Sequence, residues 1–113
     1  MHELALAASL IELVEEQARA HGLSRVVRVS MAIGDLAVVE RDALRIGFEL
    51  AAKETVAEGA ELVVQAVAGR GRCIACSATV DVAARGVPCS ACGSYDWVLV
   101  SGDELRLTSL EGS

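Results

Sequence analysis

The chain is poor in aromatic residues and has no long apolar run. Phenylalanine, tyrosine and tryptophan together make up 3% of its 113 residues, and the formal net charge is −6. Without an aromatic run to stack on bases, and with a charge that repels phosphate, nucleic acid is a poor partner. No stretch has the length of an apolar membrane span, and no positively charged flank of a secretory signal precedes Leu4. We therefore expect a cytoplasmic protein with neither a membrane nor a nucleic acid as partner.

The sequence also lacks a catalytic arrangement. Its two histidines, His2 and His21, lie far from the cysteine-containing segment, and no stretch groups a serine, a histidine and an acid. A hydrolase would need such a nucleophile and base, or a metal ion with an open coordination position. We expect that the protein is not an enzyme.

Cysteine occurs only in two Cys-x-x-Cys pairs, Cys73 with Cys76 and Cys89 with Cys92. This spacing is typical of a tetrathiolate zinc site, in which each tight turn supplies two sulfurs. Four thiolates fill the tetrahedron and leave no position for an activated water, so the spacing favours structural zinc. Reduced thiols in the cytoplasm also favour a metal over two disulfides. Iron in the same sulfur geometry, and hence an electron carrier, stays open, whereas a redox dithiol is disfavoured because two matched pairs suggest one shared ion.

Hydrophobic periodicity predicts an α/β fold. Apolar residues at three- and four-residue spacing indicate a helix from Leu4 to Ala20, with an apolar face of Leu4, Ala7, Ala8, Ile11, Val14 and Ala18. The other expected elements are a strand in which Val27, Val29, Met31 and Ile33 share one face, a helix over 41–55, and strands over 61–67, 97–100 and 104–110. The last strand should return to the main sheet. We predict two helices on a small mixed β-sheet with an inserted four-cysteine zinc-ribbon subdomain.

The expected domain division follows the cysteines. Residues 1–68 plus 101–113 would form the α/β domain, and residues 69–100 the zinc-binding ribbon. The ribbon is too short to bury much core, so bound metal would supply most of its stability.

The amino terminus offers a second metal site. The terminal amine of Met1, the backbone nitrogen that follows it and the imidazole of His2 can close five- and six-membered chelate rings around one ion, an array that suits square-planar nickel or copper. A simpler interpretation is that His2 is a polar residue at a frayed end and Glu3 an acid in the first helical turn. Glu40 could likewise serve only to cap the second helix, and the residues alone leave these alternatives open.

Several motifs occur together in one order along the whole chain: Met1-His2-Glu3-Leu4, Ile33-Gly34-Asp35-Leu36 before Glu40, 56–62, the four cysteines, and 101–105. This combination resembles the HypA/HybF family of hydrogenase-maturation nickel metallochaperones. The resemblance implies that Met1, His2 and Glu3 bind nickel, with Glu40 close enough to support them. It also implies that Cys73, Cys76, Cys89 and Cys92 hold structural zinc.

The resemblance further implies a nickel carrier. Members pass nickel to the precursor of the nickel-iron hydrogenase large subunit, with a maturation GTPase as partner, and in some organisms also serve urease. This chain departs from some relatives, because no histidine lies beside its cysteines and Pro88 precedes Cys89 where a proline is otherwise expected after it. Coupling of the zinc site to pH through histidine is therefore not expected.

An alternative function is a zinc-ribbon interaction module without a nickel role. Its evidence is three arginines in the ribbon, Arg70, Arg72 and Arg85, which Asp81 and Asp96 partly offset.

Overall fold

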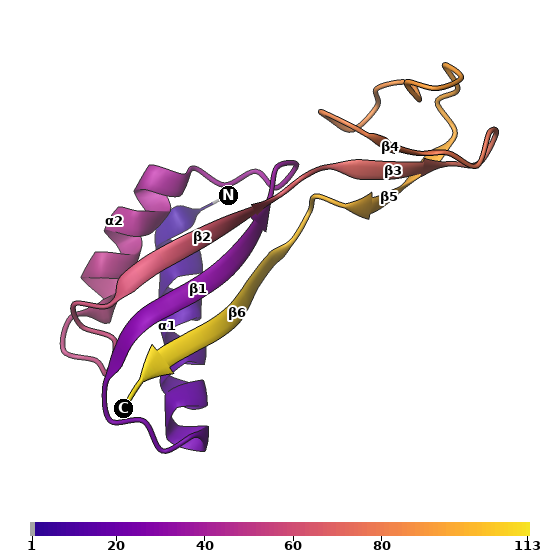
Figure 1. Cartoon of the computed structure of the whole chain (residues 1–113). Helices are drawn as coiled ribbons and strands as arrows, with labels where there is room; N and C mark the ends of the chain where they lie inside the picture. Colours follow the sequence, from indigo (N-terminus) through magenta and orange to yellow (C-terminus); the bar gives the residue numbers. More distant parts are fainter. Residues whose placement is uncertain (1) are drawn as a thin grey trace. The chain divides into compact units, whose positions relative to one another are not determined.

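The computed structural model describes residues 2–113. Along the chain the elements are α1 (Glu3–Ala20), β1 (Val26–Gly34), α2 (Arg41–Ala52), β2 (Glu61–Val67), β3 (Arg70–Cys73), β4 (Thr79–Asp81), β5 (Trp97–Ser101) and β6 (Leu105–Gly112) (Figure 1). They form two three-stranded sheets, in the orders β2-β1-β6 and β4-β3-β5. Among the described residues, neither helix is long and apolar enough to cross a bilayer. The predicted class, two helices with a small mixed sheet and a four-cysteine ribbon, is confirmed.

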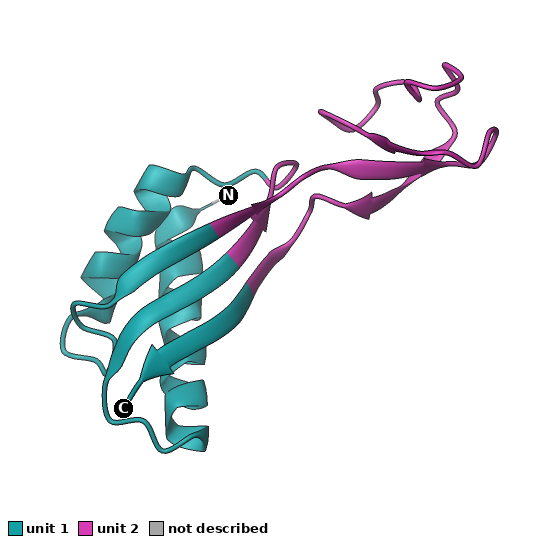
Figure 2. Cartoon of the chain, in the orientation of Figure 1, with its two compact units in different colours: residues 1–31, 38–64, 107–113 teal, residues 32–37, 65–106 magenta. Residues whose placement is uncertain are grey.

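Contacts divide the chain into two compact units (Figure 2). The first comprises Met1–Met31, Val38–Val64 and Leu107–Ser113, and the second comprises Ala32–Ala37 and Gln65–Arg106. The second unit contains all four cysteines. The domain boundaries expected from the sequence, with a ribbon of residues 69–100, stay a prediction.

In the first unit, α1 and α2 lie on one face of the sheet formed by β1, β2 and β6 (Figure 1). β1 and β2 run parallel and are joined through α2, whereas β6 runs antiparallel to β1, so the sheet is mixed. The two helices approach closely at Gly47, where an added Cβ would lie 3.1 Å from the Cβ of Ala7. The buried side chains of this layer include Ala7, Leu10, Ile11, Val14, Ala18, Val26, Val29, Met31, Leu44, Phe48, Ala52 and Leu62.

The buried face of α1 differs in part from the prediction. Leu4 is 64% exposed and Ala8 is also exposed, whereas Leu10 is buried. Ala8 lies about 100° around the helix from the fully buried Ala7, which places it outside the stripe that faces the sheet. Residue spacing predicted the stripe but did not fix its centre.

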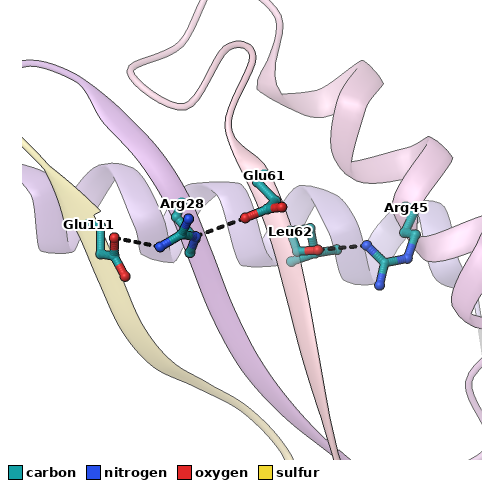
Figure 3. Close-up of polar contacts among 5 residues, drawn as sticks. All are labelled: Arg28, Arg45, Glu61, Leu62 and Glu111. Carbon is teal, nitrogen blue, oxygen red and sulfur yellow. Dashed lines mark hydrogen bonds and ion pairs between the residues drawn. The ribbon is translucent and has the colours of Figure 1, made fainter.

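The start of β1 also breaks the predicted alternation. Val26 is fully buried and Val27 is 48% exposed, although Val27 was expected inside. The neighbouring Arg28 lies between two acids on the flanking strands, 2.8 Å from Glu61 Oε1 and 2.8 Å from Glu111 Oε2 (Figure 3). Val27 and Arg28 are thus two successive exposed residues between the buried Val26 and Val29.

Helix α2 ends three residues before the predicted Thr55. Lys53 has an extended ψ of 133°, and Glu54 adopts a left-handed φ of 63°. The Thr55 hydroxyl then donates to the Ala52 carbonyl over 2.6 Å. This side-chain bond satisfies a carbonyl at the helix end and stops the helix.

The second unit contains the antiparallel sheet β4-β3-β5, of which the sequence predicted only β5. In this sheet Arg72 lies opposite Thr79 on one side and Val98 on the other. Gly71 lies under the ring of Trp97, because a Cβ there would lie 2.5 Å from Trp97 Cε3. The Trp97 indole Nε1 donates to the Val87 carbonyl at 2.6 Å and so ties β5 to the loop before the second cysteine pair.

Candidate metal centres

The four cysteine sulfurs converge on one point in the second unit. All of them lie within 4.8 Å of one another, with 3.6 Å from Cys73 Sγ to Cys92 Sγ and 3.8 Å from Cys76 Sγ to Cys89 Sγ. A tetrahedral zinc ion with Zn–S bonds of about 2.3 Å has sulfur edges of roughly 3.8 Å. The separations fit one ion held by four thiolates and are far longer than a disulfide bond.

The two cysteine pairs sit in matching backbone turns. In each turn the first cysteine donates its N–H to a carbonyl five residues on, and its own carbonyl accepts from the N–H four residues on. The bonds are Cys73 N to Ala78 O (2.8 Å), Ser77 N to Cys73 O (2.9 Å), Cys89 N to Ser94 O (2.7 Å) and Gly93 N to Cys89 O (2.7 Å). At the fifth residue of each turn, counted from its first cysteine, the backbone is left-handed, with φ of 64° at Ser77 and 80° at Gly93. The same turn thus presents both sulfurs of each pair to one point.

Backbone N–H groups favour the thiolate at both Cys89 and Cys92, whereas the neighbouring thiols lower the pKa of Cys89 and raise that of Cys92. The N–H groups of Ala91 and Cys92 hydrogen-bond to Cys89 and lower the pKa of its thiol to about 7. The Ser94 N–H favours the Cys92 thiolate, but hydrogen bonding with Cys73 and the other thiols, together with desolvation, outweighs it and raises the pKa of Cys92 to about 12. Four adjacent sulfurs cannot all ionise without a cation, so the donor set fits a bound divalent metal.

The amino-terminal residues lie in the first unit. Met1, one of the three predicted nickel ligands, lies outside the described residues. His2 is the N-cap of α1, with φ −81° and ψ 99°, and its carbonyl accepts the N–H of Leu6 at 3.0 Å. Its side chain makes no capping hydrogen bond. The imidazole is therefore not committed to the helix.

Glu3 and Glu40 are brought together, although they are far apart in sequence. The Glu40 backbone N–H donates to Glu3 Oε2 at 3.1 Å, and this bond is the main cause that lowers the pKa of Glu3 below 4.5. The Glu40 carboxylate in turn accepts from Asp42 N at 3.2 Å and Ala43 N at 2.6 Å. Glu40 is thus the N-cap of α2, as the simpler interpretation predicted, and it also contacts the start of α1.

Three further residues considered in the sequence, His21, Arg70 and Arg85, have structural partners in the fold. His21 is the C-cap of α1, and its Nδ1 lies 2.9 Å from the Gln17 carbonyl, so it belongs to the helix end. Arg70 pairs with Asp81 at 3.4 Å, and Arg85 with Asp103 at 3.7 Å. The shared role of Ser77 and Gly93 was not predicted, although each directly follows a Cys-x-x-Cys pair, which is the signal that could have revealed it.

Comparisons with known proteins give the same family over nearly the whole chain. A family model described as "Hydrogenase/urease nickel incorporation, metallochaperone, hypA" matches residues 1–112. The hydrogenase maturation factor HypA of Azotobacter chroococcum mcd 1 is 42% identical over 111 residues, which cover 98% of each chain. The protein of the same name from Geobacter metallireducens is also 42% identical over 111 residues, again 98% of each chain.

Solved structures match the fold. The solution structure of the nickel metallochaperone HypA from Helicobacter pylori has a TM-score of 0.73 and 30% identity, and the match covers 99% of this chain and 97% of that one. A second solution structure of a HypA protein gives a TM-score of 0.75 and 31% identity, with coverage of 100% and 97%. With a full-length family match and relatives above 40% identity, the chain belongs to the HypA family of nickel metallochaperones for hydrogenase maturation.

Proposed function

We propose that this chain binds nickel at its amino terminus, through Met1, His2 and Glu3, and delivers it for the maturation of nickel-iron hydrogenase. In the same proposal, Cys73, Cys76, Cys89 and Cys92 hold structural Zn²⁺. The observation that carries the proposal is a free imidazole at the N-cap of α1, followed by a carboxylate that the backbone of Glu40 holds in place.

The start of α1 is suited to nickel ligation through backbone nitrogen. The first N–H groups of a helix have no carbonyl partner within the helix. His2 is the N-cap and Glu3 the first residue of α1, and the N–H of Leu6 donates to the His2 carbonyl in the first turn. Loss of an amide proton to nickel would therefore break no helical hydrogen bond. Nitrogen donors in a planar arrangement are those that nickel prefers.

Glu40 acts in this proposal as a positioning residue. Both of its carboxylate oxygens cap α2, and its backbone N–H holds the Glu3 carboxylate. The Glu3 carboxylate in turn places negative charge beside the proposed cation. Substitution of Glu40 would thus act on nickel through Glu3 and the first turn of α2.

The cysteine cluster would serve stability and not transfer. Zinc bound by four thiolates has no open position, so nickel would not need to enter the cluster. Zinc would offset two of the four negative charges on the sulfurs and close the loop between the two turns. A thiolate site also needs reduced cysteines, which suits the cytoplasm.

Delivery would take place by ligand exchange at the chain end. A frayed helix terminus can exchange its donors one at a time, which suits handover to a second protein. The partners we propose are the maturation GTPase and the precursor of the hydrogenase large subunit, with urease as a further recipient of nickel. The chain would carry the ion and catalyse no reaction.

Nickel calorimetry on tag-free protein tests the proposal. His2→Gln removes the imidazole but keeps a large second residue, so the initiator methionine should stay in place, and intact mass confirms this. We expect nickel affinity to fall by more than about tenfold while zinc content is unchanged. His21→Gln is the matched control and should bind nickel as the wild type does. Unaltered nickel affinity in His2→Gln protein would contradict the assigned site.

A further inference from the structure

Gly47 lies in the middle of α2, where glycine is an unfavourable residue. Inside a helix glycine is less favourable than alanine, because it loses more backbone freedom on folding. Among the described residues it is the one glycine within either helix. Its backbone is helical and not left-handed, so the conformation itself does not call for glycine. The reason for glycine at this position therefore lies in what surrounds it.

The space beside Gly47 is filled by the first two turns of α1. A Cβ on Gly47 would lie 3.1 Å from the Ala7 Cβ, 3.2 Å from Leu4 Cδ2 and 3.5 Å from the Glu3 carbonyl oxygen. Carbon atoms in contact are ordinarily about 3.5–4.0 Å apart. Leu4 is 64% exposed and can turn away, whereas Ala7 is fully buried and its methyl group has no other rotamer. The contact with Ala7 therefore limits how closely the two helices approach.

The contact between Glu3 and Glu40 lies along the same seam between the helices. Glu40 caps α2 seven residues before Gly47, which is about two helical turns, so both residues face the same side of α2. Glu3 precedes Ala7 by four residues, about one turn of α1. At this end of the seam the Glu40 N–H donates to Glu3 Oε2 at 3.1 Å.

The hydrogen bond between Glu40 and Glu3 leaves little room for the helices to separate. Its length of 3.1 Å is near the upper end of the usual range of about 2.7–3.2 Å for such bonds. A methyl group at Gly47 would have to move about 0.4 Å away from the Ala7 Cβ to reach an ordinary contact distance. Passed on to the start of α1, this displacement would stretch the bond to about 3.5 Å. Two N–H groups in the first turn of α2 hold the Glu40 side chain, so Glu40 would not follow α1.

We propose that Gly47 is a positioning residue for nickel. The missing side chain sets the spacing between α1 and α2 at which the Glu40 backbone holds the Glu3 carboxylate beside the ion. This role rests on the proposed nickel site at Met1, His2 and Glu3. Loss of a partner that orients a metal ligand typically lowers metal affinity by about 10–100-fold. The lower end of this range applies here, because a methyl group at Gly47 stretches the bond and does not remove its donor.

Moving one methyl group between the helices tests this role, with nickel calorimetry on zinc-loaded, tag-free protein. Gly47→Ala should weaken nickel binding by about tenfold. The double variant Ala7→Gly with Gly47→Ala restores the space and should bind nickel within about twofold of the wild type. Ala7→Gly alone is the matched control and should also bind as the wild type does, although glycine makes α1 less stable. Nickel affinity would then follow the spacing of the helices and not the stability of the fold.

The amide resonance of Glu40 reports the same spacing in nickel-free protein. Glu3→Ala removes the acceptor and gives the position of this resonance when the hydrogen bond is absent. In Gly47→Ala the Glu40 amide proton should shift toward that position, and in the double variant it should return to the wild-type position. An unshifted resonance in Gly47→Ala would overturn the proposal, because the contact would not depend on the spacing at Gly47.

His2→Gln, measured in the same titrations, separates failure of this role from failure of the proposed nickel site. If His2→Gln loses nickel affinity and Gly47→Ala does not, the role of Gly47 is overturned and the nickel site stands. A double variant that stays as weak as Gly47→Ala, or an equal loss in Ala7→Gly alone, would also overturn the role of Gly47. Unaltered affinity in His2→Gln would overturn the nickel site and, with it, this role.

Discussion

At the scale of single residues, the Glu3 carboxylate reports on the contact between α1 and α2. The Glu40 N–H lowers the pKa of Glu3 from the ordinary value of a glutamate, so the stabilisation is present above the unfolded pKa and is lost as pH falls through the folded pKa. A carbon-13 NMR titration of the Glu3 carboxyl should therefore give a lower midpoint in the folded protein than in the unfolded chain, and Glu3→Gln should remove this part of the acid dependence of unfolding. A Glu3 midpoint equal to or above that of the unfolded chain would show that the contact is absent in solution.

Ser77 and Gly93 hold the same left-handed position in matching turns, but only one of them is glycine. A side chain in this conformation costs about 1 kcal/mol. We expect Ser77→Gly to stabilise the zinc-loaded protein by roughly 0.5–1 kcal/mol, and Gly93→Ala to destabilise it by about 1 kcal/mol. No atom lies within 4 Å of a Cβ placed on Gly93, so the second effect would be conformational and not a clash. Chemical unfolding of both variants measures the effects, and changes of the opposite sign would refute them.

At the scale of secondary-structure elements, Trp97 joins β5 to β3 through Gly71. A methyl group at Gly71 would overlap the indole ring, so Gly71→Ala should destabilise the ribbon by about 1–3 kcal/mol. Amide hydrogen exchange of the ribbon, which can be measured with and without Trp97, follows its unfolding in both backgrounds. In a Trp97→Leu background the same substitution should cost less, because the overlap is removed. An equal cost in both backgrounds would show that Trp97 does not limit the space at Gly71.

The two helices were predicted from a regular apolar stripe, and the structure places them close to the expected bounds. β2 was also predicted at its observed bounds, although it buries only Leu62. β3 and β4 were not predicted as strands, because four- and three-residue segments show no periodicity. β3 depends on pairing with β4 and β5, and β4 on pairing with β3. The exposure of Val27 was likewise not predicted, because the alternation of burial breaks at Val27 and Arg28.

The two candidate metal sites also differ in how much of each could be predicted from the sequence. Two cysteines three positions apart must share a turn, so spacing alone predicted that the sulfurs would meet. The contact of Glu3 with the Glu40 backbone joins residues from two helices, and only the tertiary fold reveals it. That Glu40 would support the nickel site came from the resemblance to a known family and not from any local pattern.

At the scale of the whole molecule, the two units should respond differently to metal removal. The first unit has a core of its own that includes Val14, Leu44 and Phe48, whereas the unit with the cysteines buries few large side chains. Chelation under reducing conditions should therefore abolish the fixed environment of Trp97 but preserve the helical circular dichroism signal. Loss of both signals together on chelation would show that the units are one cooperative structure.

X-ray absorption at the nickel edge, on protein loaded with one nickel and one zinc, tests most directly whether nickel binds at the amino terminus. We expect nickel with nitrogen and oxygen neighbours only, an imidazole contribution that is lost in His2→Gln, and zinc with four sulfur neighbours in both proteins. Sulfur in the first shell of nickel would contradict it, because nickel would then occupy the cysteine cluster and the amino terminus would not be the carrier site.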